Sequence, residues 1–250
     1  MRRLGKLSAK RDRRNLKFRT LLTVLPEIPD AWDVDYPAPV NIPLPTFANL
    51  EWGDCVIAGR AHNTLRFEAL EQGRLIEISD QEVLEQYWKE GGGNSDSRPD
   101  NGLYMLDSLN SWRQEGWTAG GQHYDIYAYA EVNRSKQYEV QAAIYLLNGL
   151  YCGFSLPLMA EDQLEKGQCW YYKPGPGSNP GSWGGHCMYL CGYSHIGPTA
   201  ITWGRKQLMS WEWFDQYCDE AYAVVDNKDR FIDSELDLEM LSEYLRAVTK

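Results

Sequence analysis

In the first half of the chain, apolar residues recur with the spacing of an amphipathic helix. The clearest example is a helix predicted over residues 103–114, from the spacing of Leu103, Leu106, Leu109 and Trp112. A proline-free run of helix formers that Gly73 ends predicts another helix, from Cys55 to about Gln72. Ser79, followed three residues later by Glu82, is a capping pattern that predicts a helix through about Lys89.

After Gly120-Gly121 the pattern becomes strand-like, with dense aromatic and apolar residues over 124–132. Residues 139–147 are predicted to form a short helix. Six glycines and three prolines between residues 167 and 185 predict a long loop. Further strands are predicted at 151–156, 186–192, 200–203 and 221–225. A helical half followed by a β-rich half predicts an α+β fold.

The two ends of the chain differ from this central part. Prolines make residues 26–46 an extended, non-helical lead-in. Residues 234–248 predict an amphipathic helix whose apolar stripe either docks on the body or binds a partner. The predicted organisation is a basic arm at 1–25, a domain at 26–228 with halves at about 47–120 and 121–228, and a C-terminal helix within 229–250.

Composition and charge exclude several classes of protein. With 43% hydrophobic and 24% charged residues the chain is neither disordered nor of low complexity. No apolar run approaches the roughly 18 residues that span a bilayer, so we expect no membrane association. Residues 1–19 hold nine basic residues and one acid, a net charge of +8, so the remainder carries −18 of the total of −10.

This distribution separates the arm from the body. The acidic body would repel nucleic acid, whereas the arm could contact a polyanion or an acidic surface, or remain a solvated terminus. We expect it to lie outside the core. The apolar stretch Leu21–Leu25 is too short for a secretion signal, which predicts a cytoplasmic protein. The six cysteines show no metal-ligand spacing, and neither a metal nor a cofactor is predicted.

The candidate chemistry centres on Cys55 and His186. Cys55 begins a predicted helix, where unpaired amides and the helix dipole favour a thiolate, although a buried structural cysteine would fit the same position. Asn49 stands six residues before it. His186 follows two glycines and enters an apolar strand, a setting that suits a catalytic imidazole.

The order and spacing of these motifs resemble the papain-like cysteine peptidases over roughly residues 28–225. In that family a Gln stands six residues before a nucleophilic Cys that opens the central helix; here these places hold Asn49 and Cys55. The stretch 78–83 matches the start of the family's next helix. His186 is followed by Gly192-Tyr193 at the family's distance, and residues 201–204, Ile-Thr-Trp-Gly, echo the family's Asn-Ser-Trp-Gly. Within this superfamily, the sequence motifs most resemble those of papain-like proteins of bacteria and their phages.

The resemblance implies a two-subdomain fold, with the Cys on the helical half and the His on the β-rich half. It assigns catalysis to Cys55 and His186, with Asn49 and the Cys55 backbone amide as oxyanion donors, and places Asn101, Gly102, Gly185 and Trp203 at the substrate cleft. The family's orienting Asn falls on Ile201 when aligned on Trp203-Gly204, and on Thr202 when counted from His186. Only Thr202 could bond the imidazole. Asp54, beside Cys55, would oppose a thiolate.

Two main functions follow from the resemblance, and a third possibility is another acyl-transfer chemistry on the same fold, such as amidase or transglutaminase activity. The first is a thiol hydrolase that cleaves peptide or isopeptide bonds in a protein or peptide substrate. The second is a structural or binding component, for example of a phage particle, with phage structural proteins as partners and the virion as its location. Intact Cys55 and His186 favour the first function, whereas the altered third position and the acidic body favour the second.

Overall fold

The computed structural model describes residues 2–23, 26–38, 40–91 and 100–226, together with Asp237 and Leu241. Its centre is an antiparallel sheet in the order β4-β9-β5-β6-β7-β8, with the short β1 pairing with β6. The strands are β1 (Trp32–Asp33), β4 (Ala128–Glu131), β5 (Leu150–Leu156), β6 (Gly184–Tyr193), β7 (Pro198–Thr202), β8 (Arg205–Leu208) and β9 (Cys218–Val225). A separate hairpin joins β2 (Trp117–Ala119) to β3 (Gln122–Tyr124).

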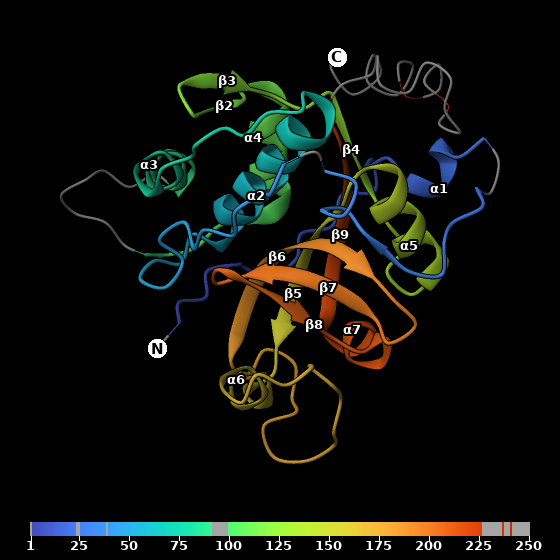
Figure 1. Cartoon of the computed structure of the whole chain (residues 1–250). Helices are drawn as coiled ribbons and strands as arrows, with labels where there is room; N and C mark the ends of the chain where they lie inside the picture. Colours follow the sequence, from blue (N-terminus) through green and yellow to red (C-terminus); the bar gives the residue numbers. More distant parts are fainter. Residues whose placement is uncertain are drawn as a thin grey trace.

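Helices cover this sheet from different sides (Figure 1). The helical half consists of α2 (Cys55–Glu71), α3 (Asp80–Gly91) and α4 (Met105–Gln114). The remaining helices are α1 (Phe18–Leu21), α5 (Gln137–Leu146), α6 (Leu158–Glu165) and α7 (Trp211–Tyr217). The predicted α+β architecture is therefore correct, and α2, α3 and α4 match the three predicted helices to within two residues. Ser79 and Glu82 form the predicted capping box, with the Ser79 backbone N–H donating to Glu82 Oε2 over 2.8 Å.

Several elements differ from the prediction. Of the stretch 124–132, only Tyr124 lies in β3 and residues 128–131 form β4, with no strand between them. The sequence did not predict β1, β2, β8, α1, α6 or α7. The predicted C-terminal helix lies largely outside the described residues. Of that segment, Leu241 is buried and donates its backbone N–H to the Asp237 carbonyl over 3.1 Å.

The basic arm does not lie outside the core, so that prediction was wrong. Leu16, Phe18 and Leu21 are all at most 5% exposed and belong to the main hydrophobic cluster. Lys6 is buried as well. The prediction treated every cation as solvated, whereas the acidic body supplies partners within the same chain: Arg2 pairs with Glu165, Lys10 with Asp107 and Lys17 with Glu131.

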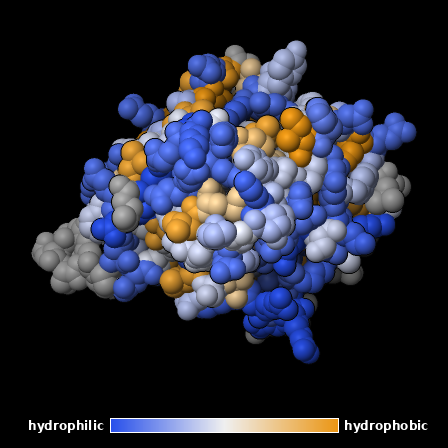
Figure 2. Space-filling model, turned by 90° about the horizontal axis from the view of Figure 1, so that it is seen from below, coloured by the Kyte–Doolittle hydropathy of each residue, from blue (hydrophilic) through white to orange (hydrophobic). Residues whose placement is uncertain are grey.

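The face seen in Figure 2 is mostly hydrophilic, with apolar residues in separate groups. Among the described residues, none of the helices is long and apolar enough to cross a membrane. In the same part of the chain, no three His, Cys, Asp or Glu side chains are grouped so that they could hold a metal ion.

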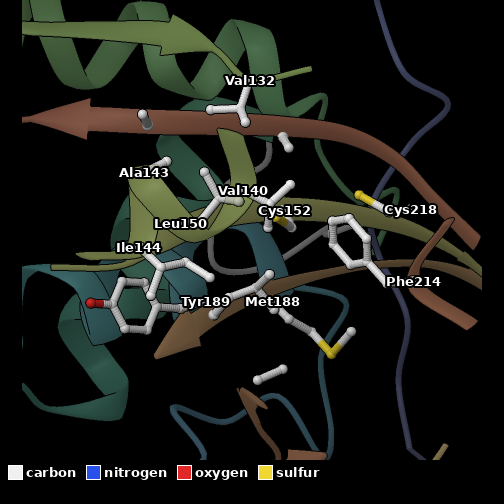
Figure 3. Packing of buried hydrophobic residues seen from close by; sticks show 14 of the residues in the cluster. Val132, Val140, Ala143, Ile144, Leu150, Cys152, Met188, Tyr189, Phe214 and Cys218 are labelled. Carbon is white, nitrogen blue, oxygen red and sulfur yellow. The ribbon is translucent and has the colours of Figure 1, made fainter. Parts of the chain in front are cut away.

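Two clusters of buried apolar side chains flank the sheet. One lies under α2, α3 and α4, and the other under α1, α5 and α7. Figure 3 shows part of the second cluster, where Val140 and Ile144 of α5 meet Leu150 and Met188 of the sheet. At about 25 cal/mol per Å² of buried apolar surface, these clusters supply the main favourable term in folding. The cluster under α2, α3 and α4 packs α2 against β6, and this junction positions the candidate site.

Candidate active site

Cys55 is the first residue of α2 and is fully buried. Its Sγ accepts a hydrogen bond from the backbone N–H of Cys187 on β6 over 3.4 Å. Burial raises the pKa of the Cys55 thiol to about 11, against the opposing effect of the backbone amides of Cys187 and Gly5. In this arrangement Cys55 is therefore a neutral thiol.

His186 precedes Cys187 on β6, so the α2–β6 junction brings the two predicted catalytic residues to the same place in the fold. The His186 Nε2 atom lies 2.7 Å from Thr202 Oγ1, which is the contact that the sequence allowed Thr202 to make. The Trp203 ring stacks on the imidazole with the centroids 4.2 Å apart and the planes 12° from parallel. Trp203 holds a φ of 46°, a strained conformation for a bulky residue.

The two residues do not form the direct hydrogen bond expected of a Cys–His pair. Within the described part of the chain, the His186 Nδ1 atom has no hydrogen-bond partner. Burial, with a further contribution from the Lys6 charge, lowers the pKa of His186 to about 3, so the imidazole is neutral. With both groups neutral, the attraction between a thiolate and an imidazolium is absent.

Asn49 is buried close to the start of α2, but its amide is engaged elsewhere. Its Nδ2 donates to Asp54 Oδ1 over 2.8 Å and to the Trp52 carbonyl over 3.1 Å. The two N–H groups of Asn49 therefore have acceptors and are not free for an oxyanion in this state. Burial raises the pKa of Asp54 well above its ordinary value. The Asp54 charge contributes to the raised pKa of the Cys55 thiol, in the direction that the sequence predicted.

The N-terminal segment of the chain, residues 4–7, runs between the helical half and β6 (Figure 1). Leu103 donates its backbone N–H to the Gly5 carbonyl over 2.8 Å and accepts from Leu7 over 2.9 Å. On the other side of the segment, the backbone N–H of Lys6 donates to the Gly185 carbonyl over 3.1 Å. We call the set of positions that contact this segment the groove: Gly53, Gly102, Leu103, Gly153, Gly185, Asp219 and Glu220.

Glycines make this close approach possible. A Cβ atom at Gly102 would lie 2.0 Å from the Gly5 carbonyl oxygen, and one at Gly185 would lie 2.0 Å from that of Lys6. A Cβ at Gly5 itself would lie 1.7 Å from the Gly53 carbonyl oxygen. Asn101 lines a cavity of about 430 Å³ that continues from Leu7 and Gly102. Three of the four predicted substrate-cleft residues, Asn101, Gly102 and Gly185, thus lie along the N-terminal segment or its continuation, and Trp203 lies on His186.

The structure also brings in residues that the sequence analysis missed. Gly5, Lys6, Leu103 and the Asp219-Glu220 pair all contact or belong to the segment in the groove. A signal was present: Lys6 is flanked by Leu4, Gly5 and Leu7, a short group of uncharged residues near the start of the basic terminus. The high net charge of residues 1–19 predicted a solvated arm instead.

We compared the chain with known protein families, curated proteins and solved structures. No family model matches the chain, and no curated protein matches it by sequence. Solved structures do match. Xylellain, a cysteine protease from Xylella fastidiosa, has a TM-score of 0.68 at 14% identity over 91% of this chain and 98% of its own. ProCathepsin B S9 from Trypanosoma congolense has a TM-score of 0.60 at 12% identity over 90% and 87%.

The Carica candamarcensis cysteine protease CMS1MS2, solved in complex with E-64, has a TM-score of 0.56 at 14% identity over 80% of this chain and all of its own. At these identities the likeness concerns the fold. The chain has the papain-like α+β fold of two subdomains, and the solved structures that share it include cysteine proteases.

Proposed function

We propose that this protein is a papain-like thiol hydrolase that cleaves peptide or isopeptide bonds, held inactive here by its own residues 4–7. The observation that carries the proposal is that a stretch of polypeptide, residues 4–7, lies beside Cys55 and His186, held by main-chain hydrogen bonds to Leu103 on one side and to Gly185 on the other. Main-chain pairing of this kind binds a peptide irrespective of most of its side chains.

The reaction needs the segment to leave the groove. Water then reaches Cys55 and His186, and the burial that holds both groups neutral is relieved. Departure of Lys6 also removes a positive charge that lowers the pKa of His186. The proton of the Cys55 thiol passes to the free Nδ1 of His186, giving a thiolate and an imidazolium.

The thiolate then forms a bond to the carbonyl carbon of the substrate, and the carbonyl electrons move to oxygen. The Cys55 backbone amide is the proposed donor to this oxyanion, a contribution of roughly 2.7–4 kcal/mol. Asn49 joins it only if its amide leaves Asp54. Collapse breaks the carbon–nitrogen bond, His186 protonates the departing amine, and water hydrolyses the thioester to regenerate the thiol. Thr202 and Trp203 keep the imidazole in place throughout.

The test uses Gly5→Ala in the full chain, because the added Cβ overlaps the Gly53 carbonyl and expels the segment. We expect iodoacetamide to alkylate Cys55 at least about ten times faster in Gly5→Ala than in the unmodified protein, measured by peptide mass spectrometry. Ser8→Ala, at an exposed position of the same arm, is the control and should leave the rate unchanged. Gly5→Ala should also hydrolyse fluorogenic peptides, and Cys55→Ala should abolish that activity.

The second candidate is a binding component of a larger particle, phage structural proteins included. The observation that favours it is the unformed Cys55–His186 hydrogen bond. On this alternative, Gly5→Ala exposes Cys55 to alkylation but no peptide is hydrolysed. Hydrolysis that survives Cys55→Ala would contradict the proposed site.

A further inference from the structure

Lys6 is the charged residue of the N-terminal segment, residues 4–7, and it is deeply buried. Its side chain is 1% exposed, and its Nζ lies 3.1 Å from Asp219 Oδ1 and 3.1 Å from Glu220 Oε1. It also donates to the Leu7 carbonyl over 3.0 Å. A lysine is almost never buried without such partners, because the loss of hydration must be offset by opposite charge.

The walls that receive this side chain are shaped for it. A Cβ at Gly153 on β5 would lie 2.2 Å from Lys6 Cε, so the missing side chain there makes room for the aliphatic stem. Gly153 pairs with Glu220 on β9, and the next pairing joins Phe154 to Cys218, so Asp219 is an extra residue at a β-bulge. Neighbouring residues of a regular strand face opposite sides, but a bulge lets Asp219 and Glu220 both face Lys6.

The two carboxylates are held by the protein as well as by Lys6. Ser155 Oγ donates to Asp219 Oδ2 over 2.7 Å, and the Tyr222 hydroxyl donates to Glu220 Oε2 over 3.2 Å. These donors stay in place when the segment leaves. An empty pocket would then contain two closely spaced carboxylates with no cation, an arrangement whose burial is costly.

We propose that Gly153, Ser155, Asp219 and Glu220 form an acidic subsite of the groove, and that its substrates present a lysine side chain to it. This inference rests on the proposed function, because a subsite selects substrates only if the protein is a hydrolase. Lys6 is then the chain's own occupant of a subsite that also selects foreign peptides. The residue in the subsite is the one whose N–H bonds to Gly185, directly before His186, so the selected lysine lies beside the catalytic histidine.

The charge states are consistent with this role. Burial opposes the charge of Lys6, but Glu220 and Asp219 outweigh it and leave the pKa of Lys6 raised, so the occupant is a cation. Burial raises the pKa of Glu220 despite Lys6. A neutral side chain of the same length would fill the space but leave the carboxylates unpaired.

The test is a binding measurement with two synthetic octapeptides that copy residues 2–9, one with lysine at position 6 and one with norleucine. Each is titrated into full-length Gly5→Ala by calorimetry. We expect the lysine peptide to bind at least about ten times more tightly. Competition from the tethered segment weakens both peptides equally, so the ratio of the two dissociation constants is unaffected. Glu220→Gln in the Gly5→Ala chain should bring that ratio close to one.

Matched variants control for folding and for net charge. Asp219→Asn, at a partly exposed position, should lower the ratio in the same direction and replaces Glu220→Gln if that variant does not fold. Glu131→Gln removes an equal charge outside the groove, where Glu131 pairs with Lys17, and should keep the ratio. Equal binding of the two peptides, or binding of neither, overturns the subsite.

The outcome is separable from that of the proposed function because binding needs no catalysis. If no peptide is hydrolysed but the lysine preference is found and depends on Glu220, then the hydrolase proposal fails and the subsite remains. If peptides are hydrolysed at equal rates with lysine or norleucine at this position and bind equally, then the hydrolase proposal remains and the subsite fails.

Discussion

At the scale of single residues, His186 is fixed by two contacts that act on different parts of its ring. Thr202 bonds Nε2, and Trp203 covers the ring face. A ring held in this way keeps Nδ1 as the only nitrogen available to a thiol or a leaving group. Thr202 can therefore do the orienting work that the resemblance assigned to an Asn, since the third member of a catalytic triad mainly fixes the tautomer and the orientation of the imidazole.

Replacing Thr202 with Val keeps the shape of the side chain and removes the hydroxyl. Because Nε2 of the buried His186 loses its partner, we expect the free energy of unfolding to fall by about 1–3 kcal/mol. In the Gly5→Ala chain, hydrolysis should slow while alkylation of Cys55 continues. Urea unfolding and peptide turnover measure the two effects. Thr199→Val, on the same strand but outside the site, should change neither by a comparable amount; equal effects of both variants would contradict the role of Thr202.

The residues of this site differed in how far the sequence predicted them. Cys55, His186 and Thr202 follow one another in an order and spacing that survive at low identity, so they could be found without a structure. The contacts of Lys6 with Asp219 and Glu220 could not be predicted, because they depend on a β-bulge at Asp219 and on a strand pairing between Gly153 and Glu220. Neither is visible in local sequence, and a basic terminus alone predicts a solvated arm.

At the scale of elements, α2 lies close against the sheet at Gly59. A Cβ there would lie 2.9 Å from the Tyr151 ring and 3.2 Å from the Cys187 sulfur. The Tyr151 hydroxyl donates to the Val56 carbonyl of α2, so the ring cannot retreat. The same packing brings Cys55 Sγ to the Cys187 amide. Gly59, one turn further along α2, thus helps to position the start of this helix.

This packing predicts the result of Gly59→Ala. In an isolated helix alanine is favoured over glycine by about 1 kcal/mol. Here we expect the opposite sign, a destabilisation of about 1–3 kcal/mol from overpacking against Tyr151 and Cys187. Gly91→Ala, in α3, is the matched control: its Cβ would lie an ordinary 3.7 Å from Leu103, so this variant should be neutral or stabilising. Urea unfolding of both variants decides, and stabilisation by Gly59→Ala would refute the argument.

The elements that the sequence did not predict share a physical cause. Helix α7 spans seven residues and its buried side chains are Trp213, Phe214 and Tyr217, too few to establish a helical period. Strand β8 reads Arg-Lys-Gln-Leu, a largely polar stretch that becomes a strand because it pairs with β7. Tertiary pairing decides such short segments, whereas the longer helix α2 followed from its own composition.

At the scale of the whole molecule, a terminus of charge +8 lies on a body of charge −18. The exposed pairs, such as Lys10 with Asp107, each contribute at most about 1 kcal/mol. The apolar residues Leu16, Phe18 and Leu21 are buried in the core and anchor the arm more firmly. This combination tethers residues 4–7 near the groove, as the proposed reversible inhibition requires.

The core also holds histidines in their neutral form, and this predicts how stability depends on pH. His62 of α2 is 3% exposed and packs against Phe47 with the ring centroids 4.9 Å apart. Burial, with a contribution from Arg66, lowers the pKa of His62 well below its ordinary value of 6.5. Below that pH the unfolded chain binds a proton at His62 that the folded chain does not. The free energy of unfolding therefore falls as the pH falls.

The variant His62→Gln isolates this contribution, because every other titrating group is common to both proteins. Above about pH 6.5 the difference in unfolding free energy between the two proteins should be constant. Below it, the difference should shift in favour of His62→Gln by about 1.4 kcal/mol per pH unit. Urea unfolding at pH 7.5, 6.5, 5.5 and 4.5 measures it. Parallel pH curves for the two proteins would show that folded His62 takes up a proton as readily as the unfolded chain, and that its burial is not retained in solution.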